Sequence, residues 1–290
     1  MSKEASIELV EQQTASDDLI RLLKEIFKTD RFGQPVVMEG QILYNGYQLL
    51  KQMPKPLEEE ILYERFYKGR QQRYEALIAP HMTEIQPLPF NMGSEANSKY
   101  LYCGEEPQHS VLLSPYKIST IPVTEEIYHE YNSAHKVTHK LNPAVNMTWY
   151  DAYMFAVWCN TELPTEAEWE YACRGGTNGP FFCQEEQLTA YAWFSENSKG
   201  VLHETAHLAA NPYGLYDMLG NVWEWCLDTY DSEFYHNSKS LNPINSTANG
   251  NKSCRGGSFH SFTDMCRSAF RHHEPASFYA YDLGFRVIKK

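Results

Sequence analysis

The chain has 290 residues, of which 42% are hydrophobic and 14% aromatic, including 20 tyrosines. This composition is typical of a folded protein with a sizeable core. The formal net charge of −12 opposes the phosphate backbone, so we expect no nucleic-acid ligand. No apolar stretch approaches the ~18 residues of a membrane span, and the N-terminus has no basic region followed by an apolar run. We therefore expect a cytoplasmic protein by default.

Two helices are predicted in the first 84 residues. "SDDLIRLLKEIFK" has Ser16 as a plausible N-cap, and "PLEEEILYERFYKGRQQRYEALI" predicts a second, longer helix. Beyond residue 85, short segments rich in Tyr and Trp are broken by Gly, Pro and Asn. We expect a helical appendage over residues 1–84 and a separate domain over 85–290.

Three further helices are predicted inside that domain. They begin at Thr124, Thr148 and Thr165, and the third has Glu168 to complete a capping box and Gly175 to end it. The seven cysteines are an odd number and show no C-x-x-C spacing, which argues against a disulfide framework or a zinc knuckle. We expect reduced, mostly buried thiols.

Six motifs follow one another in a characteristic order: "FNMGS", "PVTEEIY", "LPTEAEWEYACRGG", "NPYGLYDMLGNVWEW", "RGGSF" and "LGFRV". In that order they resemble the formylglycine-generating-enzyme family, also called the sulfatase-modifying-factor family, over roughly residues 85–290. The resemblance implies an α+β fold of the C-type-lectin-like kind, with little regular secondary structure. It leaves the helical appendage unexplained.

The resemblance also implies a structural calcium site at the segment matching "DMLGNVWEW". Asp217 and Glu224 would supply carboxylate oxygens, and Gly220 and Val222 backbone carbonyls, which are the hard ligands that calcium takes. Asn197 resembles a ligand of the family's other calcium site. The alternative is that Glu224 caps a backbone turn or pairs with a buried Arg.

A copper site is not expected. The family's oxidase holds copper with two Cys a few residues past "GGS"; here Ser261 stands at the first position and Cys266 lies near the second. One thiolate does not select soft Cu(I), and Cys254 has no counterpart in the ligand pattern. We therefore expect Cys266 to be a buried structural thiol.

Iron is the other metal that the resemblance raises, because a second enzymatic branch binds it through an upstream His-rich motif. No His precedes His81 here, so that motif is missing. The remaining combination is His260, His272, His273 and Glu274, since imidazoles and a carboxylate can form a facial triad. The alternative is that these are surface residues of a ligand-binding loop.

The C-terminal segment resembles the variable region of proteins diversified by retroelements, which display a changeable binding face on the same fold. Undiversified relatives share its "CRSA" and "GFR" motifs, so this interpretation stays open. The resemblance places variation, and hence ligand binding, at His260, Ser261, Phe262, Phe270, His272, His273, Phe278, Tyr279, Ala280, Tyr281 and Asp282.

Aromatic side chains of this segment suit recognition, because Tyr and Phe give rigid contact area at low entropic cost. We expect Phe262, Phe270, Tyr279 and Tyr281 to be exposed anchors; the alternative is that about half of the segment's aromatics are core. Trp223 should be a core residue. Four arginines are expected to tie the fold together through hydrogen bonds rather than to contact ligand: Arg255, Arg267, Arg271 and Arg286.

Two functions follow. The first is a non-catalytic module that binds a protein or other macromolecule through the C-terminal aromatic face. The second is a metal-dependent oxidoreductase of the same family with a non-standard site; a purely structural role is the remaining alternative. Metal content separates the first two, because stoichiometric copper or iron favours the enzyme.

Overall fold

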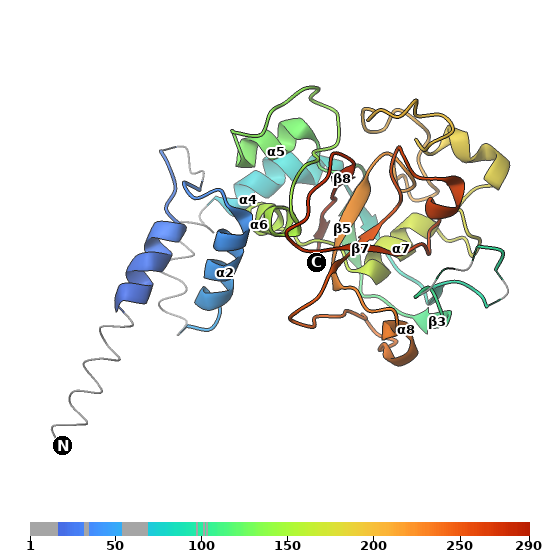
Figure 1. Cartoon of the computed structure of the whole chain (residues 1–290), viewed down its shortest axis with the longest axis horizontal. Coiled ribbons are helices and arrows are strands. Elements are labelled where there is room, and N and C mark those ends of the chain that lie inside the picture. The colour runs from blue at the N-terminus through green and yellow to red at the C-terminus, as the bar shows by residue number, and fades with distance from the viewer. Residues whose placement is uncertain (1–16, 32–34, 54–68, 97, 101, 103) are drawn as a thin grey trace, which may run out of the picture.

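The computed structural model describes residues 17–31, 35–53, 69–96, 98–100, 102 and 104–290 (Figure 1). The predicted N-cap Ser16 and the first part of the second predicted helix lie outside these residues. Residues 17–26 are helical, as expected. The described end of the second predicted helix consists of α4 (Arg70–Arg73) and the π-helical turn η2 (Tyr74–Ile78), and the short η3 (Ala79–His81) follows it.

An additional helix, α2 (Gly40–Leu50), was not predicted. It buries Leu43 and Leu50 and packs its Tyr44 ring against Trp149 and Tyr153 of α6, with ring centroids 5.3 and 5.1 Å apart. The N-terminal helices therefore share one hydrophobic core with the rest of the chain. Figure 1 shows them at one end of the molecule, with α6 between them and the strands.

The three helices predicted inside the domain are confirmed. They are α5 (Glu125–Tyr131), α6 (Trp149–Trp158) and α7 (Glu166–Arg174). The Thr165 hydroxyl accepts from the Glu168 N–H, the Glu168 carboxylate accepts from the Thr165 N–H, and Gly175 ends α7 with a φ of 57°. Shorter helical turns follow at η4 (Glu185–Ala190), α8 (Phe234–Asn237) and η5 (Thr263–Met265).

In the described part of the chain, strands form three small sheets. The first, in the order β1-β4-β9, pairs β1 (Met82–Ile85), β4 (Tyr116–Ser119) and β9 (Ile288–Lys289), so the sheet begins three residues before the expected boundary at 85. A hairpin pairs β2 (Phe90–Met92) with β3 (His109–Val111). The third sheet has the order β7-β6-β5-β8 and contains β7 (His272–Glu274), β6 (Lys252–Arg255), β5 (Trp223–Thr229) and β8 (Leu283–Gly284).

Four buried arginines tie the loops together, as predicted. Each guanidinium lies 2.6–2.8 Å from a buried carboxylate. Removing either member of such a pair leaves an uncompensated charge in the interior, which is costly. The pairs therefore hold together loop segments that make few β-sheet hydrogen bonds. The partners are Arg255 with Glu170, Arg267 with Glu105, Arg271 with Glu166, and Arg286 with Glu224.

The two Trp residues of β5 differ in burial. Trp225 is fully buried and its indole N–H donates to the Met147 carbonyl at 3.3 Å. Trp223 is only half-buried, so its predicted place in the core is wrong. It lies at the start of the strand, where Phe270 and His272 cover part of its ring at centroid distances of 5.8 and 4.9 Å.

Among the described residues, no helix is both long and apolar enough to cross a membrane.

Candidate ligand-binding face

The turn that precedes β5 is buried and holds two neighbouring segments close together. Gly220 and Asn221 have φ angles of 74° and 60°, and a Cβ on Gly220 would lie 2.1 Å from the Trp193 carbonyl oxygen. Glycine is therefore required at this close approach of two backbones. The Asn221 amide donates to the His203 carbonyl at 3.0 Å and accepts from the His203 N–H at 3.2 Å, which fixes the neighbouring loop.

Glu224, a predicted calcium ligand, forms a buried ion pair. Its carboxylate accepts from Nε and Nη2 of Arg286 at 2.6 and 2.7 Å, and from the indole N–H of Trp169 at 2.7 Å. All three side chains are fully buried. Both oxygens of this carboxylate are engaged and a guanidinium neutralises it, so the structure shows the pairing with a buried Arg that the sequence left open as the alternative. A calcium ligand at Glu224 stays a prediction.

The other predicted calcium ligands are engaged within their own turns. Asp217 is buried and accepts from the Ala206 N–H at 2.8 Å and from the Asn221 amide at 3.3 Å; burial raises its pKa to about 6. The Asn197 amide bridges Phe194 N–H and the Ala192 carbonyl. In the described part of the chain, no three His, Cys, Asp or Glu residues gather as a metal site. Calcium binding through Gly220 or Val222 carbonyls stays a prediction.

The positions that match the family's copper ligands are closed. Cys266 is fully buried, and burial raises the pKa of its thiol far above the usual range. Its sulfur packs so closely that a Cβ on Gly257 would lie 2.7 Å away. Ser261 is also buried and its hydroxyl accepts from the Ser258 N–H at 2.8 Å. The structure therefore does not present it to a ligand, and its role in ligand binding stays a prediction.

The His and Glu residues that were considered as an iron triad do not gather into one group among the described residues. His272 packs against Trp223 and lies 3.2 Å from the Glu274 carboxylate. His273 stacks on Tyr230 at 4.1 Å and is hydrogen-bonded to the Asn251 amide. His260 belongs to another cluster, with its ring 5.6 Å from that of Tyr281. Each imidazole therefore has its own neighbours.

Four aromatic side chains of the C-terminal segment are exposed: Phe262 (66%), Tyr279 (63%), Tyr281 (58%) and Phe278 (40%). The predicted exposure of Phe262, Tyr279 and Tyr281 is thus confirmed. Phe270 is buried, and its prediction as an exposed anchor is wrong. The Tyr102 ring covers it edge-on at 5.1 Å, from a segment more than 160 residues away in the sequence.

Tyr281 connects the two loops that carry these rings. Its centroid lies 6.0 Å from that of Phe259 and 5.6 Å from that of His260. The loop before it is anchored where the Asn146 N–H donates to the Ala280 carbonyl at 3.0 Å. Residues 259–262 and 275–282 together form what we call the aromatic face; Asp282, half-buried, lies at its end and accepts from the Trp223 N–H.

A hollow of about 710 Å³ adjoins this face. Its lining includes Phe259 and Tyr281 of the face, Val201, and the two residues His135 and Lys136, which follow α5. This volume is within the range of small-ligand sites. Sequence reasoning missed the last three residues, which come from separate loops; the exposed Val201 follows no recognisable binding motif.

Comparisons with known proteins agree with the motif order. The family described as "Sulfatase-modifying factor enzyme 1-like domain" matches residues 70–290. "Serine/threonine-protein kinase pkn1" of Chlamydia caviae is 41% identical over 152 residues, covering 51% of this chain and 24% of the relative. "Formylglycine-generating enzyme" of Streptomyces coelicolor is 33% identical over 162 residues, covering 50% of this chain and 52% of the relative. The chain thus spans about half or less of these curated relatives.

Two solved structures resemble the whole domain. PvdO from Pseudomonas aeruginosa has a TM-score of 0.68 at 23% identity, which reflects the fold alone. Treponema denticola variable protein 1 has a TM-score of 0.57 at 25% identity. Each covers 72% of this chain and 94% of its own.

Proposed function

Because the chain belongs to the sulfatase-modifying factor enzyme 1-like family and has its α+β, C-type-lectin-like fold, we propose that it is a non-catalytic module that binds a protein through the aromatic face. The observation that carries this proposal is the exposure of Phe262, Phe278, Tyr279 and Tyr281 within 20 residues of one another. Single exposed rings are common, whereas grouped rings mark interaction sites.

The framework around these rings favours a display surface. Arg267 and Arg271, between the two exposed loops, are locked to Glu105 and Glu166. The exposed aromatic residues of the loops can therefore be replaced by other residue types without loss of the ion pairs that stabilise the fold. The likeness to a protein named variable protein 1 supports sequence variation among sister copies at Phe262, Phe278, Tyr279 and Tyr281. Buried Ser261 and Phe270 belong instead to the framework.

The alternative is an oxidoreductase of the same family. Relatives named formylglycine-generating enzyme are consistent with it. Against it, the position of the first copper ligand carries the Ser261 hydroxyl, and Cys266 is a fully buried thiol. Stoichiometric copper or iron in the purified protein, lost together with an oxidase activity on chelation, would contradict the binding module.

Binding is tested with variants of the exposed rings. Tyr279→Ala and Tyr281→Ala should weaken binding to a partner captured by the wild-type protein by about 30-fold, which corresponds to a hot spot of roughly 2 kcal/mol. Leu241→Ala is the matched control, because Leu241 is 57% exposed but lies outside the aromatic face. Unchanged affinity of both Tyr variants would contradict the proposal.

A further inference from the structure

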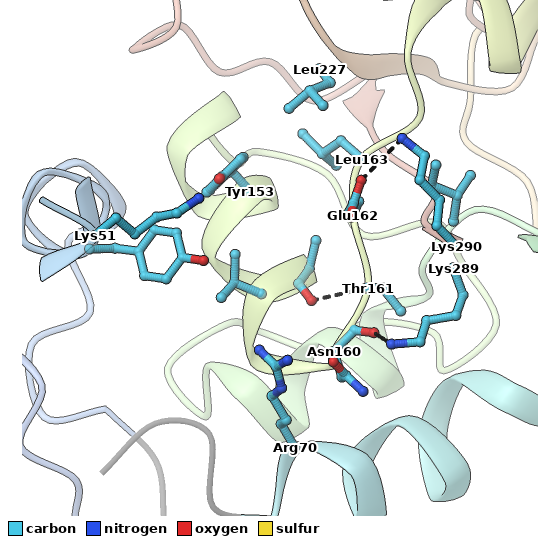
Figure 2. Close-up of a pocket in the computed structure, with 14 residues that line it drawn as sticks. Lys51, Arg70, Tyr153, Asn160, Thr161, Glu162, Leu163, Leu227, Lys289 and Lys290 are labelled. Atoms are coloured by element: carbon cyan, nitrogen blue, oxygen red, sulfur yellow. Dashed lines mark hydrogen bonds and ion pairs between the residues drawn. The ribbon is translucent and has the colours of Figure 1, made fainter. Parts of the chain in front are cut away.

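A second cavity, of about 490 Å³, lies where α2, the start of α4, the end of α6 and strand β9 meet (Figure 2). It shares no lining residue with the hollow beside the aromatic face. Its volume is also within the range of small-ligand sites. The proposed function makes no use of this cavity.

The lining is unusual in its charge. The chain has 37 acidic residues against 25 Lys and Arg, yet four cations and one carboxylate line this cavity. An acidic protein thus concentrates positive charge around one concave site, where low-dielectric walls strengthen the field. The charged residues are Lys51, Arg70, Lys289, Lys290 and Glu162.

Only one of the lysines is neutralised by a described carboxylate. Lys290 Nζ lies 3.3 Å from Glu162 and 3.2 Å from Glu168. Lys289 Nζ instead donates to the Asn160 carbonyl oxygen at 2.6 Å, and Lys51 Nζ lies 5.3 Å from the Tyr47 ring centroid. Within the described ranges, neither Lys51 nor Lys289 has a carboxylate within 4 Å.

The cations that line the cavity come from three separate segments. Figure 2 shows Lys51 after the end of α2, Arg70 from α4 and Lys289 from β9, with Asn160 beside Lys289. Burial and the Arg70 charge lower the pKa of Lys289. Lys117 stands directly opposite Lys289 on β4, and like charges in that position are unfavourable. An anion in the cavity would offset the mutual repulsion of Arg70 and Lys289, both of which line it.

Apolar side chains complete the lining. Leu227 and Tyr153 are half-buried and expose apolar surface to it, while Leu163 and Ile288 are fully buried behind the accessible surface. A ligand with a carbon skeleton could therefore contact apolar surface while its charged groups meet the cations. We propose that this cavity binds a small organic anion carrying at least two negative charges, on phosphate or carboxylate groups.

Calorimetric titration of the full chain tests this site, with glycerol 2-phosphate and citrate as probes at low ionic strength. We expect saturable binding of at least one probe, and the probe that binds more tightly distinguishes the phosphate from the carboxylate source. Lys51→Gln and Lys289→Gln should each weaken it at least tenfold. Lys51 is exposed, so its variant remains informative if replacement of Lys289 impairs folding.

Lys239→Gln is the matched control, because Lys239 is an exposed lysine that does not line the cavity. It makes the same change in net charge and should leave the affinity within twofold of wild type. Absence of saturable binding of both probes would overturn the proposal. Equal affinities for wild type and Lys51→Gln would also overturn it, since binding would then not use the cavity. Neither result bears on the aromatic face.

Discussion

Replacing Glu224 by Gln tests the buried ion pair at the centre of the fold. Gln keeps the shape of Glu and one oxygen to accept from the Trp169 indole, which lies 2.7 Å away. It presents an amide nitrogen to Arg286, whose guanidinium is fully buried and makes two bonds of 2.6 and 2.7 Å to the carboxylate. The variant therefore leaves a positive charge uncompensated in the interior.

Breaking a buried pair on one side costs about 3–5 kcal/mol, and we expect this loss in the free energy of unfolding for Glu224→Gln. Urea denaturation followed by Trp fluorescence measures it. Glu126→Gln is the matched control, because Glu126 makes a solvent-exposed pair with Lys140 at 2.6 Å. That variant should leave the denaturation midpoint nearly unchanged, since exposed pairs contribute little.

Calcium provides the discriminating condition. If Glu224 acts only through Arg286, the loss is the same in calcium-containing buffer and after chelation. If Glu224 were a calcium ligand, the loss would depend on calcium, because a ligand stabilises only the state that binds it. A loss below about 1 kcal/mol, or one that vanishes with chelator, would refute the assignment to the ion pair.

Three further predictions concern burial and protonation. Tyr279→Ala and Tyr281→Ala should leave the urea midpoint nearly unchanged while Trp225→Ala costs about 3–5 kcal/mol; equal losses would place the tyrosines in the core. Burial raises the Asp217 pKa from 3.8 to about 6, so the protonated group stabilises the fold below pH 3.8 and this stability is lost as pH rises through 6. Asn does not titrate, so Asp217→Asn should reduce the loss of stability between pH 3.8 and 6 by up to about 3 kcal/mol. Identical pH profiles of the thermal midpoint for the two proteins would contradict this. Cys266→Ala should cost about 1–2 kcal/mol and leave copper uptake at background, whereas tight Cu(I) binding abolished by the change would favour the oxidase.

Local signals determined the helix starts. The capping box of Thr165 and Glu168 lies within four residues, and a hydrogen-bonding pattern of that range is readable without knowledge of the fold. The motif order likewise determined the family, and the match over residues 70–290 agrees with it. By contrast, α2 begins at Gly40 without a side-chain cap. It is stable because its apolar side packs against α6, and no local sequence pattern predicts this long-range contact.

Burial of the site residues was decided only by the tertiary structure. Phe262 and Phe270 are the same residue type, but the Tyr102 ring packs on Phe270, which is buried, whereas Phe262 is exposed. In the sequence, the carboxylate of Glu224 suits calcium or an arginine equally well, and only the fold brings Arg286, 62 residues later, to within 2.6 Å of it. Sequence reasoning identified the aromatic residues of the C-terminal segment, but it did not identify the cavity, whose lining comes from segments far apart in the chain. Only long-range packing decided which of the aromatic residues meet solvent, because burial and charge pairing depend on segments far apart in the chain.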